Sequence, residues 1–127
     1  MPEYTPMVDP DPQCWLALDE YERIAVVLEY HREAGVDVPG EDTHALLHVV
    51  VENQVAMGKE APTEAVLRRL IDENLDRHDA IHAIACILAN HMYEMLHGNN
   101  VLSNDEYYAA LEQLTAEKWL RGEFSGH

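Results

Sequence analysis

Apolar residues recur at intervals of three and four positions along most of the chain, which is the spacing of one face of an α-helix. The pattern predicts helices over about residues 19–34, 42–57, 63–73, 76–97 and 104–122. No pair of alternating segments is joined by the turn residues of a hairpin. The sequence therefore predicts an all-α fold, an irregular bundle of four to five helices in a single domain.

Helix start and stop residues support these limits. Asp19 and Glu22 have the spacing of a capping box, and Gly35 is a typical residue just after a helix end. Asp76 can cap the longest helix, which Gly98 ends. The run of three valines at 49–51 would also suit a strand, but its flanking start and stop residues favour a helix.

The ends of the chain differ in composition from the middle. Residues 1–13 hold four of the six prolines and have no hydrophobic period, so they are expected to form a flexible proline-rich arm. Residues 14–122 are expected to form the helical bundle domain, and residues 123–127 to fray.

The charge balance limits the classes of partner. Among 127 residues there are 24 acidic residues against 8 lysines and arginines, a formal net charge of −16. Because binding to phosphate backbones and anionic lipids depends on basic residues, we expect no nucleic-acid partner and no membrane partner. The two cysteines cannot form a disulfide framework, and no signal sequence or membrane span is evident, so a cytoplasmic location is expected.

Two histidine pairs carry the candidate chemistry. His44 and His48 are four residues apart in one predicted helix, and His78 and His82 are four apart in another. Side chains at this spacing lie one turn apart on the same side of a helix, so both rings of a pair can bind one metal ion. Both pairs lie beside apolar stripes, and Glu52, one turn after His48, is a further candidate ligand. The predicted metal site is His44, His48, His78, His82 and Glu52.

A second interpretation of the histidines is a hydrogen-bond network inside the bundle. Buried ring nitrogens without partners would cost about 1–3 kcal/mol each, and either a metal or a network removes that cost. His31, at the end of the apolar stripe of the first helix, is interpreted as a structural residue, as are His97 and His127.

A family resemblance rests on His44, His48 and Gln54, followed by the segment Arg77-His78-Asp79-Ala80 and His82. The stretch from residue 44 to 96 resembles a small bacterial family of uncharacterised all-helical proteins with paired H-x3-H and H-E-A-x-H segments. Here an Asp replaces the usual Glu of the second segment, which shortens the reach of the acid. The resemblance implies an all-helical fold and supplies no substrate.

Three functions stay open at this point. The first is a transition-metal protein holding zinc, iron or nickel, with a hydrolase or oxygen-handling enzyme as one form of it. Catalysis would need a base, for which Glu52 and Asp79 are candidates, and no catalytic residue is assigned. The alternatives are a non-enzymatic module that binds a protein partner and a structural or regulatory homodimer, both with the histidines in a hydrogen-bond network.

Overall fold

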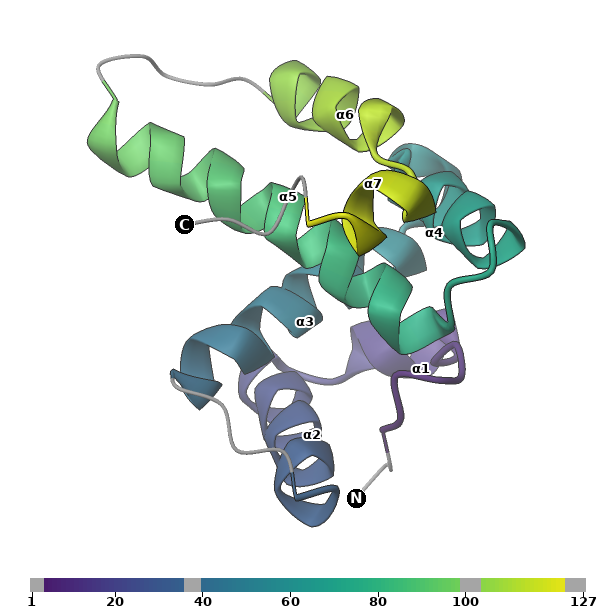
Figure 1. Ribbon diagram of the computed structural model, residues 1–127. Coiled ribbons are helices and arrows are strands. Elements are labelled where there is room, and N and C mark those ends of the chain that lie inside the picture. The colour runs from purple at the N-terminus through teal and green to yellow at the C-terminus, as the bar shows by residue number, and fades with distance from the viewer. Residues whose placement is uncertain (1–3, 36–39, 99–103, 123–127) are drawn as a thin grey trace.

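The computed structural model describes residues 4–35, 40–98 and 104–122, and the all-α prediction is confirmed over these ranges, which contain no strand. Seven α-helices and one short 3-10 helix follow one another in the described part of the chain (Figure 1): α1 (Pro12–Ala17), α2 (Glu20–Glu33), α3 (Glu41–Ala56), η1 (Gly58–Glu60), α4 (Thr63–Asp72), α5 (Arg77–His97), α6 (Asn104–Gln113) and α7 (Ala116–Leu120).

The predicted caps of the two helices that matter most for the site are present. Asp19 accepts a hydrogen bond from the backbone N–H of Glu22, whose side chain accepts in return from the N–H of Asp19, so α2 begins with a complete capping box. Asp76 accepts from the backbone N–H of Asp79 and fixes the first turn of α5. These caps set where the first histidine of α5 lies.

The described part of the N-terminal arm, from residue 4 onward, contacts the helical bundle. Tyr4 is only 8% exposed, and Asp9 pairs with arginines of α4 and α5. Asp11 caps the short helix α1, with Pro12 in its first turn. Proline removes helical periodicity but does not prevent packing, and here the buried side chains of the arm attach it to the bundle.

The predicted last helix is divided in two. α6 ends at Gln113, and Thr115 begins α7 by accepting a hydrogen bond from the backbone N–H of Lys118. The N–H of Ala116 donates to the Glu73 side chain at 2.8 Å, which ties this break to α4. Apolar residues recur at helical spacing on both sides of the break, so the hydrophobic pattern over residues 104–120 does not reveal it.

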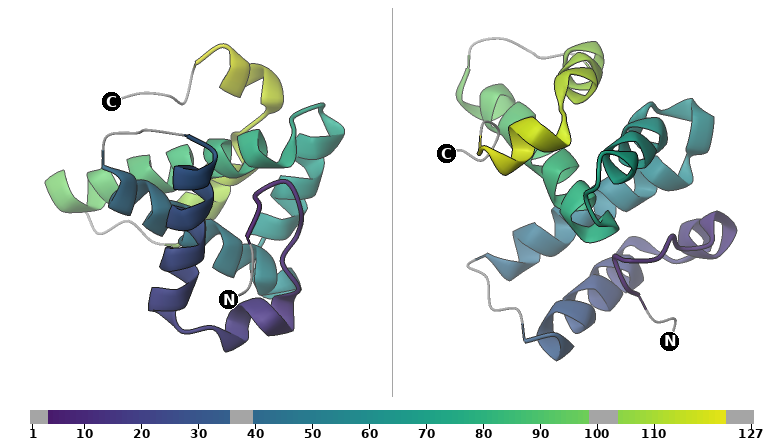
Figure 2. Two further views of the ribbon diagram at one scale, coloured as in Figure 1. Left: turned by 90° about the horizontal axis from the view of Figure 1, so that it is seen from below. Right: turned by 45° about the vertical axis from the view of Figure 1, so that its right-hand side comes forward.

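Helix α3 lies between two hydrophobic clusters. The larger cluster joins α3 to α4, α5, α6 and α7, and the smaller one joins α3 to α2, to Trp15 of α1 and to Tyr4. In Figure 2, α1 and α2 lie on one side of α3 and α5 on the other. The predicted contact between the two histidine-bearing helices, α3 and α5, is therefore confirmed. In the part of the chain that the structure describes, no helix is both long and apolar enough to cross a membrane.

Candidate metal centre

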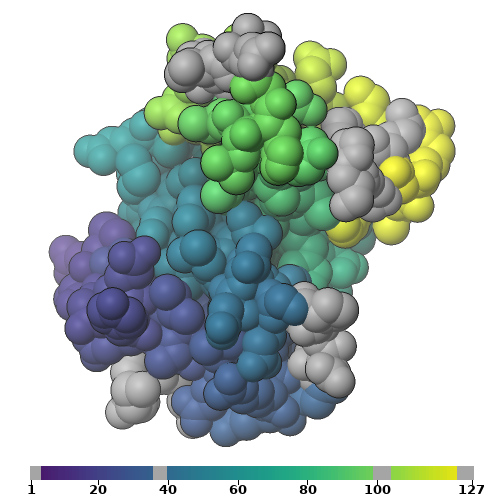
Figure 3. Space-filling view, turned by 90° about the vertical axis from the view of Figure 1, so that its left-hand side faces the viewer, coloured from purple at the N-terminus to yellow at the C-terminus, as the bar shows by residue number. Residues whose placement is uncertain are grey.

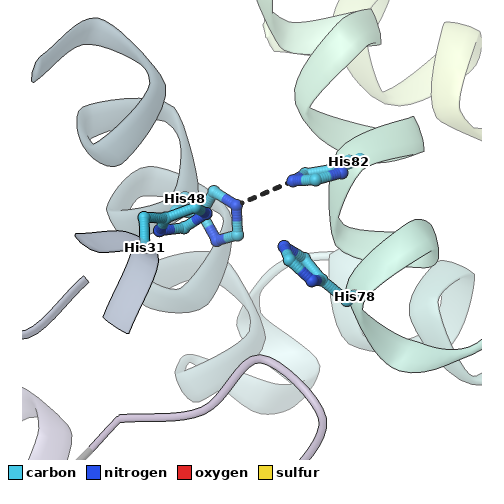
Figure 4. Close-up of side chains that lie close together, drawn as sticks. All are labelled: His31, His48, His78 and His82. Carbon is cyan, nitrogen blue, oxygen red and sulfur yellow. Dashed lines mark hydrogen bonds between the residues drawn. The ribbon is translucent and has the colours of Figure 1, made fainter. Parts of the chain in front are cut away.

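Histidines from three helices meet where α2, α3 and the start of α5 come together. His31 comes from the last turn of α2, His48 from the middle of α3, and His78 and His82 from the first two turns of α5 (Figure 4). His31 is 3% exposed and His48 is fully buried. The rings on α5 point across the helix interface toward the ring of His48.

The ring nitrogens converge on one small volume. One nitrogen from each of His31, His48, His78 and His82 lies within 4.8 Å of the corresponding nitrogen of every other. The shortest approach is 3.0 Å between Nε2 of His48 and Nε2 of His82. The ring of His44 is also close, with its centroid 4.9 Å from that of His48 and 5.0 Å from that of His82. Five imidazoles thus gather at one place, and four of them share a common centre.

The protonation of His48 is set by the residues behind it. The Tyr4 hydroxyl donates to Oε2 of Glu52 at 2.6 Å, so its hydrogen is committed to the carboxylate. The Tyr4 oxygen also lies 3.3 Å from Nδ1 of His48, where it can only accept, so Nδ1 carries the ring hydrogen. The lone pair of this neutral ring is then on Nε2, which faces the other histidines.

His31 is oriented in the same way by its own helix. Its Nδ1 lies 2.9 Å from the carbonyl oxygen of Val27, which is an acceptor, so Nδ1 carries the hydrogen and Nε2 carries the lone pair. Among the residues that the structure describes, that Nε2 is buried without a hydrogen-bond partner, and the same is true of Nε2 in His44 and in His78. Three buried ring nitrogens therefore lack a partner in one cluster, which is rare in native proteins.

The surroundings favour the neutral form of the four rings on α3 and α5, those of His44, His48, His78 and His82. Burial, followed by the neighbouring histidines, lowers the pKa of His48 to about 2 and that of His82 to about 4. Burial also lowers the pKa of His44 and of His78. Neutral imidazole is the form that binds a metal ion, so the cluster needs no deprotonation at neutral pH.

A network of ion pairs lies next to the histidine cluster, on the side of Glu52. The Arg77 guanidinium makes two hydrogen bonds to Glu52, Nη1 to Oε2 at 2.8 Å and Nη2 to Oε1 at 2.7 Å. Two further donors reach other acceptors, Nη1 the carbonyl of Pro6 and Nε the Oδ1 of Asp9, and Asp9 also pairs with Arg68. Burial opposes the charge of Arg77, but the Glu52 carboxylate outweighs it and keeps the pKa of Arg77 above its usual range. Four of the five N–H donors of Arg77 are thereby paired inside the protein.

The comparison with known proteins identifies the family. A family profile described as "Domain of unknown function (DUF1841)" matches residues 2–113. The chain belongs to this family. The match covers the arm, both histidine-bearing helices and α2, so the candidate centre lies within the DUF1841 domain. Neither a curated protein nor a solved structure gave a significant match.

Three of the five residues predicted as ligands in this DUF1841 domain converge with His31. These are His48, His78 and His82. His44 lies beside the group, with its ring at the edge of the common centre. Glu52 lies behind His48, and both of its carboxylate oxygens accept hydrogen bonds from Arg77 and Tyr4.

Sequence reasoning did not find the contributions of His31, Tyr4 and Arg77. His31 was interpreted as structural, although it continues the inward stripe of α2 in the position four residues after Val27. This inward position is the signal in the sequence that indicates His31 as a candidate ligand. Tyr4 and Arg77 carry no comparable signal, because their contacts join segments 48 and 25 residues away from Glu52.

Proposed function

We propose that this protein binds one first-row transition metal ion through His31, His48, His78 and His82. The observation that carries the proposal is the convergence of four ring nitrogens within 4.8 Å of one another, from three different helices. Imidazole nitrogen suits zinc, iron and nickel, the three metals expected from the sequence. A protein partner and a homodimer stay sequence-based predictions.

The spacing of the rings is compatible with coordination. In a tetrahedral zinc site with Zn–N bonds of about 2.0–2.1 Å, the nitrogens are about 3.3 Å apart. The 3.0 Å separation of the His48 and His82 nitrogens is close to that value, and the other separations in the group are at most 4.8 Å. The partners at Tyr4 and Val27 direct the Nε2 lone pairs of His48 and His31 toward the common centre, and an ion bound there would replace the 3.0 Å hydrogen bond between Nε2 of His48 and Nε2 of His82.

A pure hydrogen-bond network is the weaker explanation. Such a network should pair its buried nitrogens, whereas Nε2 of His31, of His44 and of His78 have no hydrogen-bond partner among the described residues. Each unpaired buried group costs about 1–3 kcal/mol. An ion bound at the common centre removes that cost for His31 and His78 at once.

The test is elemental analysis of protein purified without a polyhistidine tag. We expect close to one equivalent of zinc, iron or nickel, and a melting temperature that falls when a chelator is added, because an ion that binds only the folded chain stabilises it. His48→Ala and His82→Ala should each lose most of the ion, since each removes one ligand from an opposite side of the α3–α5 interface. Metal-free protein whose stability is indifferent to chelator would overturn the proposal.

A further inference from the structure

A pocket opens beside the histidine cluster, between α3, α5 and α7. Its volume is about 260 Å³, and its polar lining includes His44, His48 and His82. The remainder of the wall is Leu47, Ala85, Cys86, Ala89 and Trp119. Figure 3 shows α3 exposed at the surface with the C-terminal part of α5 above it. Two of the four proposed ligands therefore form part of the wall of a space that a small molecule can enter.

Among the described residues, none of the four proposed ligands is a carboxylate, and the acids that act on His78 from the start of α5, Asp76 and Asp79, do so from exposed positions. All four proposed ligands are neutral imidazoles, so a divalent ion would keep its full charge of about +2. Glu52 is the nearest buried carboxylate, but it is already neutralised by the two hydrogen bonds from Arg77. The carboxylate that the sequence offered as a ligand therefore does not compensate the ion. A low-dielectric site with uncompensated positive charge favours an anion strongly.

We infer that the pocket delivers a small monoanion to a fifth coordination position of the metal, in addition to the four histidines, with the apolar part of that molecule against Leu47, Ala89 and Trp119. This inference rests on the proposed metal site. The pocket volume suits a molecule of a few heavy atoms, such as a short carboxylate, and none of the described residues that line it is a lysine or an arginine, so the ion would be the group there that attracts an anion. The substrate or ligand class is thus a small anion with a short apolar body.

Cobalt(II) substitution allows the test, because its visible spectrum reports both binding to the protein and a change of coordination. The full chain is loaded with Co(II) and titrated with azide, then with formate, acetate and butyrate. We expect saturable spectral changes with azide and tighter binding of butyrate than of formate. Ala89→Leu, which fills the pocket from α5, should weaken azide binding at least tenfold while Co(II) still binds at one equivalent.

The matched control is Ala65→Leu, the same change at an exposed position of α4 outside the pocket. It should bind Co(II) and azide as the unchanged chain does. Failure to bind Co(II) at one equivalent would overturn the metal site itself. A Co(II) spectrum that is unchanged throughout the azide titration would overturn only the anion inference, and so would equal azide affinity in the Ala89→Leu and Ala65→Leu variants.

Discussion

Arg77 and Glu52 form a bidentate ion pair in the interior, with nitrogen–oxygen distances of 2.7 and 2.8 Å. The side chain of Arg77 is 5% exposed and that of Glu52 is 0% exposed. Arg77 is the first residue of α5, and Glu52 lies on α3 one turn after His48. The pair therefore fixes the start of α5 against α3 at the point where their histidines face each other. Its function in the structure is to hold the two halves of the candidate centre together.

Breaking this pair should be far more costly than breaking the neighbouring surface pair. Arg77→Ala leaves the Glu52 carboxylate buried, and we expect it to lower the free energy of unfolding by about 3–5 kcal/mol. Arg68→Ala removes the other arginine bound to Asp9. Because the side chains of Arg68 and Asp9 are both 45% exposed, this substitution should lower the free energy of unfolding by at most about 1 kcal/mol. Urea denaturation of the two variants measures the difference, and equal losses would contradict the assignment.

The hydroxyl of Tyr4 should affect metal affinity without contacting the ion. Tyr4→Phe keeps the packed ring but removes the oxygen that accepts from Nδ1 of His48, so this ring loses its fixed tautomer. We expect metal affinity to fall about 10–100-fold, as is usual for a residue that orients a ligand. Tyr21→Phe, at a side chain that is 85% exposed, is the matched control. Competition with a chromophoric chelator measures both affinities, and no difference between them would exclude this role for Tyr4.

The structure and the sequence differ over the fourth histidine. His31→Ala should release most of the bound metal, whereas His44→Ala should retain close to one equivalent, because only His31 belongs to the group of four. His97→Ala, on the exposed end of α5, controls for the removal of any histidine. Elemental analysis of the three variants decides the matter. Loss of metal in His44→Ala with retention in His31→Ala would restore the ligand set predicted from the sequence.

Deleting the arm should destabilise the protein, contrary to what its proline content indicates. Removal of residues 1–10 eliminates the buried Tyr4 ring, the Pro6 carbonyl and the Asp9 carboxylate, the last two of which bind Arg77. We expect the melting temperature to fall by more than about 5 °C. Met7→Ala, a side chain that is 49% exposed, should leave it unchanged. A thermal melt of the truncated chain that overlays the full-length melt would show that the arm contributes nothing to stability.

Stability of the metal-free chain should fall as the solution is acidified. Unfolded histidines take up protons below pH about 6.5, whereas burial lowers the pKa of His82 to about 4 and of His48 to about 2. Between pH 6.5 and 4 the unfolded chain binds more protons than the native chain, so the free energy of unfolding decreases, by up to about 1.4 kcal/mol per pH unit for each such histidine. The loss due to His82 is complete near pH 4, and that due to His48 continues below it.

Urea denaturation at pH 7, 6 and 5 in the presence of a chelator measures this slope. His48→Leu, which replaces the most deeply buried ring by an apolar side chain of similar size, should have a shallower slope than the unchanged chain. Identical slopes in the two proteins would show that His48 is not held neutral by the fold.

Local signals in the sequence were sufficient for the helices and for part of the site. Asp19, Asp76 and Gly98 predicted the ends of α2 and α5 correctly, because capping depends on residues within one turn. The same locality explains why His78 and His82 could be recognised as a pair, since four-residue spacing places two rings on one side of any α-helix. The Asp11-Pro12 start of α1 is an equally local signal that was overlooked in favour of the proline content.

The tertiary structure alone decided which histidines share a centre and whether the Glu52 carboxylate is available as a ligand. His31 joins the group because α2 packs against α3, and Glu52 leaves it because Arg77 and Tyr4 occupy both of its oxygens. These contacts connect residues that are far apart in the sequence: His31 and His48 are 17 positions apart, and Tyr4 and Glu52 are 48 positions apart. Hydrophobic period and caps specify each helix but not the angle at which helices cross, and it is the crossing that places one side chain opposite another.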